Sequence, residues 1–279
     1  MNAAWLDHWL ERTPDRTRLT TSRSGIRFVP TAAGDVRIRH RPGPGLRLFV
    51  GVDGPDGIEH HDGLLAALDP STDVVVMEPP GTGGSRPARG FVPGLDAHAR
   101  VVDEVLAALG GPRHLVMPCW LGFVAARVDP RHVVSLTLPQ TPPWADMQTW
   151  VRRVDPRGLL RTPLVGQLVV ALRRRAVIDG WYRASLGHRD QHASTVETAN
   201  RVQACGGCFG LASLIQGLQS EHAPERPVQA HVVWGERDRT HRFSDPGPHA
   251  RRFADAGHRP HLEEPEPFVA WWQEAVDGR

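Results

Sequence analysis

The 279-residue sequence contains no lysine: its 33 basic side chains are all arginine, and they nearly balance 31 acidic ones. Without an excess of positive charge, nothing indicates a nucleic-acid or membrane-surface partner. The glycine-rich stretch Gly81–Ser85 is followed by no lysine, so it resembles a phosphate-binding loop only superficially. We therefore expect no nucleic acid and no membrane among the partners.

Cysteines and long apolar runs are also scarce. Three cysteines do not make a disulfide framework in a chain of this size, and no apolar run is long enough to span a bilayer. The first thirteen residues lack the basic start and apolar run of a signal peptide. Together these absences predict a reducing, cytoplasmic setting.

Cys205 and Cys208 enclose two glycines and form a single CxxC motif. A zinc site of this type needs a second ligand pair, and no thioredoxin-like strand precedes the motif. We interpret the segment as a break between helices, and we expect no metal and no cofactor.

Short apolar runs alternate with helical patterns through the first half of the chain. The runs at residues 46–52, 73–78, 114–118 and 132–138 predict buried strands, and residues 95–109 predict a helix that ends at Gly110. Continuously apolar strands that alternate with helices are typical of a mostly parallel sheet with helices on both faces. The fold class is therefore α/β.

The pattern changes after residue 142. Residues 143–224 contain several helix-like segments and no convincing strand, whereas residues 228–234 again predict a strand. We predict a core of residues 1–142 and 225–279, with a helical cap of residues 143–224 inserted after the sixth strand. Such a cap would cover the strand ends where open α/β sheets bind ligands. Three cap tryptophans are candidates for lining an apolar acyl pocket, with ordinary packing as the alternative: Trp144, Trp150 and Trp181.

Five motifs follow one another along nearly the whole chain: VDGPDG (52–57), EPPGTGGSRP (78–87), PCWLG (118–122), VVWGERD (232–238) and AGHRPHLEEPEPF (256–268). In this order they resemble the motifs of the α/β-hydrolase superfamily. The first resembles the oxyanion loop of the proline-iminopeptidase-like branch, and the others are similar to the loop after the next strand, the nucleophile elbow, the acid loop and the histidine loop. The resemblance implies an α/β-hydrolase fold.

The resemblance carries catalytic roles to particular residues. Cys119 falls on the nucleophile, Asp238 on the acid and His258 on the general base, and this chain order is that of the superfamily. Asp146 is the alternative acid, because some thioesterase-like members place theirs after the preceding strand. The backbone N–H of Trp120 would form half of the oxyanion hole, and that of Gly54 or Asp53 would form the other half.

Three departures from the family pattern stand out. The elbow usually has small residues two positions before and after the nucleophile, but this chain has Met117 and Leu121. The oxyanion loop has lost its histidine and a glycine. Only 20 residues separate Asp238 from His258, so we expect the helix usually found between them to be short or missing.

Cysteine at the nucleophile position indicates acyl transfer. A nearby imidazole would take the thiol proton, and the strand-to-helix turn would lower the thiol pKa further. An acyl group on sulfur is a thioester, which amines and carbanions attack more readily than water does. We therefore expect thioesterase- or cyclase-type chain release, or acyl transfer, in specialised metabolism.

The expected substrate is a small-molecule or carrier-bound acyl compound, with an acyl carrier protein as the candidate partner. The alternatives are a simple ester, lactone or amide hydrolase, a non-catalytic homologue that binds a small molecule, and a lyase that forms no acyl adduct. The sequence leaves the oligomeric state open.

Overall fold

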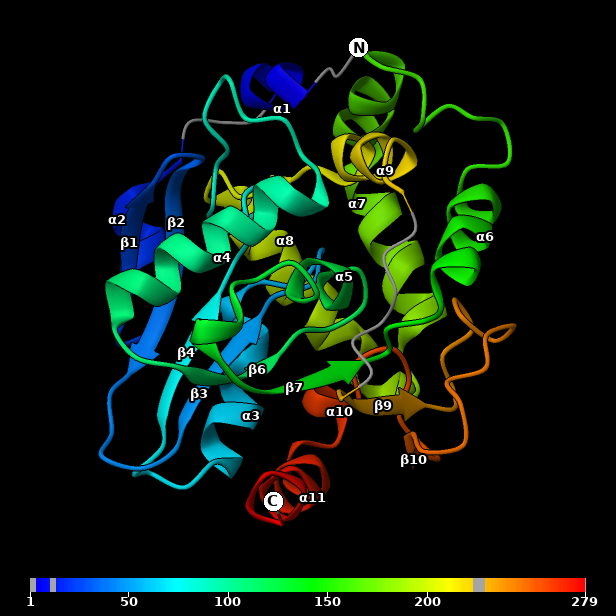
Figure 1. Ribbon diagram of the computed structural model, residues 1–279. Coiled ribbons are helices and arrows are strands. Elements are labelled where there is room, and N and C mark those ends of the chain that lie inside the picture. Colours follow the sequence, from blue (N-terminus) through cyan, green and yellow to red (C-terminus); the bar gives the residue numbers. More distant parts are fainter. Residues whose placement is uncertain (1–3, 11–13, 223–228, 279) are drawn as a thin grey trace.

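A computed structural model describes residues 4–10, 14–222 and 229–278. Its main feature is an eight-stranded sheet in the order β1-β2-β4-β3-β6-β7-β9-β10 (Figure 1). The six strands from β4 to β10 are parallel, and the hairpin β1–β2 is joined antiparallel to β4. The strands are β1 (Ile26–Thr31), β2 (Gly34–Arg41), β3 (Arg47–Gly51), β4 (Asp73–Met77), β6 (Arg113–Val116), β7 (Val133–Pro139), β9 (His231–Gly235) and β10 (Arg251–Phe253).

Helices cover both faces of this sheet, as predicted. Phe49, Val75 and Leu115 belong to an apolar cluster with α4 (Leu95–Leu109) and α5 (Leu121–Ala125). Their neighbours along the strands, which point to the other face, pack against α3 (Asp62–Ala67) and α11 (Pro265–Asp277). Figure 1 shows these helix pairs on opposite sides of the sheet. Because both faces are buried, the strands are continuously apolar.

The segment predicted as a cap is mainly helical. Figure 1 shows α6, α7 and α9 grouped above the end of the sheet formed by β7 and β9. A two-residue strand, β8, was not predicted; it pairs antiparallel with β5 (Thr82–Gly83). The elements are α6 (Trp144–Val154), α7 (Val165–Ser185), η3 (Arg189–Gln191), α8 (His192–Ala204), β8 (Cys208–Phe209) and α9 (Leu211–Gln219).

The CxxC motif lies between α8 and α9, in agreement with its interpretation as a break between helices. Cys205 follows the last residue of α8, and Cys208 begins β8; both are free thiols. None of the helices in the described part of the chain is long and apolar enough to cross a membrane.

The remaining elements are short. The amphipathic pattern of residues 3–12 predicts an N-terminal helix, and α1 forms within it; residues 3, 11 and 12 lie outside the described residues. The strand β10 was not predicted and lies between the acid and histidine loops, where no helix occurs. The other elements are α1 (Ala4–Leu10), α2 (Arg16–Thr21), η1 (Ile58–His61), η2 (Pro130–His132) and α10 (Pro260–Glu263).

Candidate active site

The predicted site residues follow strands whose carboxyl ends lie at one edge of the sheet. Asp53 comes two residues after β3, Cys119 three after β6 and Asp238 three after β9. Because β3, β6, β7 and β9 are parallel neighbours, these loops converge. His258 joins them from the loop before α10.

Cys119 occupies a tight turn between β6 and α5. Its φ angle is 54°, the left-handed region that few non-glycine residues adopt. The turn is held on both sides, since the Cys119 N–H donates to the Pro139 carbonyl (2.8 Å) and the Thr141 hydroxyl donates to the Cys119 carbonyl (3.0 Å). This backbone corresponds to the nucleophile elbow expected from the sequence.

The bulky residues on either side of the elbow are accommodated by a glycine from a different strand. Met117 and Leu121 are fully buried. A Cβ atom at Gly51, at the end of β3, would lie 2.7 Å from Leu121 Cδ1 and 3.1 Å from Met117 Sδ. In the family pattern, small residues within the elbow leave this space; here Gly51 of β3 leaves it.

Asp238, and not Asp146, contacts the histidine. Its Oδ2 atom lies 2.7 Å from His258 Nδ1, and both residues are buried. Asp146 is in the first turn of α6, and no contact joins it to His258. Asp146 therefore does not serve as the acid in this arrangement.

Two residues that sequence reasoning missed orient Asp238. Gln140 Nε2 donates to Asp238 Oδ2 (2.9 Å), while the backbone N–H and hydroxyl of Thr240 donate to Oδ1 (2.7 and 2.6 Å). Burial would raise the pKa of Asp238, but the charge of His258, its hydrogen bond to Asp238 and the hydrogen bond from the Thr240 hydroxyl lower it below its ordinary value. The sequence could have indicated Gln140, because it directly follows β7, and β7 lies next to β9, the strand that leads to Asp238.

The histidine loop is fixed by Glu263. Its carboxylate accepts hydrogen bonds from the N–H groups of Gly257 (3.1 Å), Arg259 (3.2 Å) and Gly187 (2.8 Å). The His258 N–H donates to the Ser185 carbonyl of α7 (2.7 Å). His258 is therefore held from both the core and the helical segment.

The side chain of Asp53 is an unexpected member of the site. The sequence assigned Asp53 only a backbone role, but its Oδ2 atom lies 3.2 Å from His258 Nε2. The imidazole is thus flanked by a carboxylate on each nitrogen. Burial opposes its charge, but Asp238, Cys119 and Asp53 outweigh burial and hold the pKa of His258 well above its ordinary value.

The prediction of a lowered thiol pKa is wrong. Burial, reinforced by the negative charge of Asp53, raises the pKa of Cys119 to about 11 despite the opposing effect of His258. The helix α5 has only five residues and does not reverse this. Burial and the Asp53 charge therefore favour the thiol form of Cys119, and the position of Cys119 does not by itself give a thiolate at neutral pH.

The raised pKa values of Cys119 and His258 predict that acylation of Cys119 accelerates at alkaline pH. Both pKa values are raised, so the reactive form, which has one proton fewer, becomes populated as the pH rises. We expect the adduct with an acyl thioester to form about tenfold faster per pH unit between pH 7 and 9. Rapid-quench mass spectrometry measures this, and a rate that is flat from pH 6 to 9 would contradict it.

A cavity of about 640 Å³ opens over Cys119. Of the three candidate tryptophans, Trp150 and Trp181 line it, whereas Trp144 does not. Trp144 packs edge-on against Phe123 (4.9 Å between ring centroids), because its position at the start of α6 faces α5. Five arginines also line the cavity: Arg153, Arg157, Arg173, Arg239 and Arg242.

The predicted oxyanion-hole residues border this cavity. Trp120, Gly54 and Asp53 are all among the lining residues, together with Cys119. The loop that contains Gly54 is pinned by Asp56, which accepts hydrogen bonds from Tyr182 of α7 (2.7 Å) and Arg259 (2.5 Å). An acyl carbonyl bound at Cys119 would therefore lie beside these backbone groups.

One group of side chains in the described residues has metal-ligand composition. Ligand atoms of Cys119, His241 and His258 lie within 4.8 Å of one another. However, both nitrogens of His258 contact carboxylates, and the His241 ring stacks on it with centroids 5.4 Å apart and planes 21° apart. With both nitrogens engaged by carboxylates, His258 has no lone pair free for an ion, so these contacts favour a triad over a metal site.

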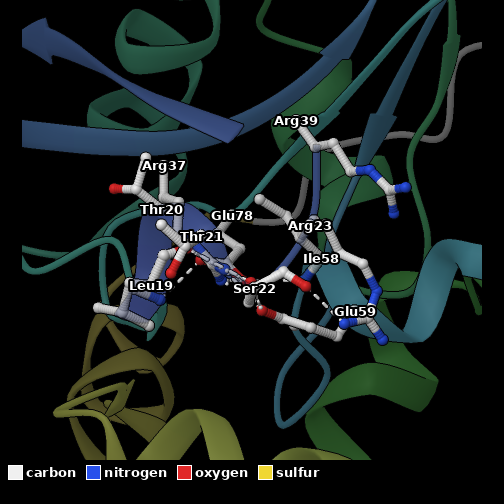
Figure 2. Close-up of polar contacts among 12 residues, drawn as sticks. Leu19, Thr20, Thr21, Ser22, Arg23, Arg37, Arg39, Ile58, Glu59 and Glu78 are labelled. Atoms are coloured by element: carbon white, nitrogen blue, oxygen red, sulfur yellow. Dashed lines mark hydrogen bonds and ion pairs between the residues drawn. The ribbon is translucent and has the colours of Figure 1, made fainter. Parts of the chain in front are cut away.

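A buried ion network is centred on Arg37 (Figure 2). Arg37 of β2 donates to Glu78 Oε1 (2.9 Å) and Glu59 Oε1 (2.6 Å). Glu78 also accepts from the N–H groups of Ile58 (2.9 Å) and Gly84 (2.6 Å). The network therefore ties the segment after the Asp53 loop to the loop that contains β5.

Comparison with solved structures agrees with this architecture. An epoxide hydrolase from an endophytic Streptomyces superposes with a TM-score of 0.70 at 17% identity, covering 92% of this chain and 96% of that one. A thermophilic esterase from Thermogutta terrifontis gives 0.61 at 17% identity, covering 91% and 98%. This chain has the α/β-hydrolase fold.

No protein-family model matches the sequence, and no curated protein matches it either. At 17% identity the similarity concerns the fold alone. Since this fold supports many chemistries, the function must be argued from the site.

Proposed function

We propose that this α/β-hydrolase-fold protein is an acyl-transfer enzyme that acts on a thioester or ester through Cys119, His258 and Asp238. The observation that carries the proposal is a buried cysteine at a left-handed strand–helix turn, which lines a cavity and whose sulfur lies within 4.8 Å of a nitrogen of His258, the partner of Asp238. A thiol, a base and an orienting carboxylate are the groups that covalent acyl transfer requires.

In the first half-reaction, His258 in its neutral form takes the proton of the Cys119 thiol, and the sulfur attacks the acyl carbonyl. The Trp120 and Gly54 N–H groups stabilise the oxyanion, and the imidazolium of His258 protonates the leaving thiol or alcohol. The acyl group is then bound to sulfur as a thioester. A second nucleophile, from the same chain or another molecule, releases it.

The cavity indicates the class of substrate. Trp150, Trp181 and Phe209 offer apolar surface to an acyl chain. The five lining arginines outnumber the two lining acids, Asp53 and Asp155, so the cavity favours a substrate with an anionic group. This combination suits an acyl chain delivered on a phosphate-bearing carrier, so an acyl carrier protein is the proposed partner.

Simple ester hydrolysis is the second candidate, because water that enters the cavity beside Cys119 would release the same acyl-enzyme. The two candidates share the acyl-enzyme but differ in the acceptor. A hydrolase should turn over p-nitrophenyl esters in water, whereas a dedicated cyclase or transferase should not.

The direct test is intact-protein mass spectrometry with acyl-N-acetylcysteamine thioesters of increasing chain length. Wild type should gain one acyl mass, and Cys119→Ala should gain none. Cys205→Ala is the matched control, because Cys205 is a free cysteine that does not line the cavity, and it should be acylated like wild type. Absence of an adduct on folded wild type at pH 7 and 9 would refute the proposal.

A further inference from the structure

The side chain of Asp53 lies between the substrate cavity and the histidine. Asp53 and Cys119 both line the cavity, whereas His258 is not among the described residues that do. Trp181 packs edge-on against the His258 ring (5.2 Å between centroids) and covers it from α7. A group bound beside Cys119 therefore meets the carboxylate of Asp53 before it meets the imidazole.

The position of Asp53 is fixed. The residue is buried, with 8% of its surface exposed, and its carbonyl accepts the Asp56 N–H (3.0 Å). Asp56 is in turn held by Tyr182 and Arg259, so the loop is tied to α7 and to the histidine loop. These contacts hold the backbone that carries the Asp53 carboxylate.

A carboxylate at this point suits only one of the two half-reactions. In the first, the proton comes from the thiol and His258 accepts it, so a second base has no proton to take. In the second, the incoming nucleophile must lose a proton beside the acyl carbon, and a carboxylate facing the cavity can accept it. Burial also raises the pKa of Asp53, which makes its carboxylate a stronger base.

We propose that Asp53 is the general base of the second half-reaction and relays the proton of a hydroxyl acceptor to His258. This rests on the proposed function, since it requires an acyl group on Cys119. The acceptor oxygen bonds to the acyl carbon while its proton passes to the Asp53 carboxylate, and the carbon–sulfur bond breaks to release the Cys119 thiolate. Asp53 then gives the proton to His258 Nε2, 3.2 Å away, and the imidazolium restores the thiol.

The test isolates the acyl-enzyme and follows its decay. Wild type, Asp53→Asn and the control Asp146→Asn are acylated with octanoyl-N-acetylcysteamine thioester, desalted, and mixed with water, methanol or hydroxylamine. For Asp53→Asn we expect acylation within about threefold of wild type but deacylation by water and methanol at least about 100-fold slower. Hydroxylamine, a strong nucleophile that needs little base assistance, should deacylate all three proteins at similar rates.

The outcomes separate the two proposals. If wild type forms no adduct, the proposed function fails, and the role of Asp53 fails with it. If wild type forms an adduct and Asp53→Asn deacylates at the wild-type rate, or loses acylation as severely as deacylation, only the role of Asp53 is overturned. A hydroxylamine rate that falls as far as the methanol rate would indicate distorted geometry and would also overturn it. Should Asp53→Asn not fold, Asp53→Gly removes the same carboxylate and is judged by the same rates.

Discussion

His258→Asn is expected to slow acylation of Cys119 by about 10³-fold, because the thiol loses the group that accepts its proton. The thiol pKa is already raised to about 11 by burial and by Asp53, so little thiolate forms at neutral pH without the imidazole. The rate is measured by quenched mass spectrometry with an acyl-N-acetylcysteamine thioester at pH 7.5.

His261→Asn is the matched control from the same loop. His261 is also buried, but its ring faces His61 (6.2 Å between centroids) and Phe268 (5.9 Å) instead of Cys119. Acylation should stay within about threefold of wild type, at some cost in stability. Equal losses in both variants would mean that folding of the loop, and not proton transfer, explains the effect.

Arg37→Met is expected to lower the free energy of unfolding by about 3–5 kcal/mol, since it leaves two buried carboxylates without their cation. Arg37 is fully buried. Burial opposes ionisation of Glu59, but its bonds to Arg37 lower its pKa to about 2. At Glu78 burial prevails and raises the pKa to about 7, although Arg37 acts against it.

The pH dependence of the free energy of unfolding tests whether the unpaired carboxylates cause the loss of stability in Arg37→Met. Without Arg37, burial raises the pKa values of both carboxyl groups above their unfolded values, so folding favours their protonated forms. The variant should therefore lose more stability at pH 8 than at pH 5, as measured by urea denaturation. A loss that is equal at both pH values would indicate a packing defect instead.

Arg39→Met provides the control on the same strand. Arg39 pairs with Asp62, whose side chain is 42% exposed, and Figure 2 shows that its side chain extends separately from that of Arg37. Exposed ion pairs contribute little, so this variant should lose less than about 1 kcal/mol. A comparable loss in both variants would contradict a special role for the buried network.

Much of the fold could be predicted because its signals are local. Burial on both faces makes the strands continuously apolar, and a turn between an apolar run and a helical pattern marks the elbow at Cys119. The strands β8 and β10 could not be predicted, because they have two and three residues, which is too few to show a periodic pattern. Their pairing depends on neighbours far along the chain.

Predictions from residue type along one segment failed where a residue distant in the chain determined the packing. The large side chains of Met117 and Leu121 indicated a crowded elbow. They fit because Gly51, about seventy residues earlier in the chain, has no side chain there. Trp144 has the same composition signal as Trp150 and Trp181, yet packing against Phe123 removes it from the cavity. The sequence of one segment does not show which residues from other segments its side chains will contact in the fold.

The sequence by itself determined the alternation of strands and helices, the order of the five motifs and the location of Cys119 at a strand–helix turn, because these depend on residues close together in the chain. Only the tertiary structure decided that Asp238 instead of Asp146 contacts His258, that Asp53 lies against its other nitrogen, and that the thiol pKa is raised. These properties depend on distances between residues up to 205 positions apart and on burial from water. Both arise only when the parallel strands bring their loops to one edge of the sheet.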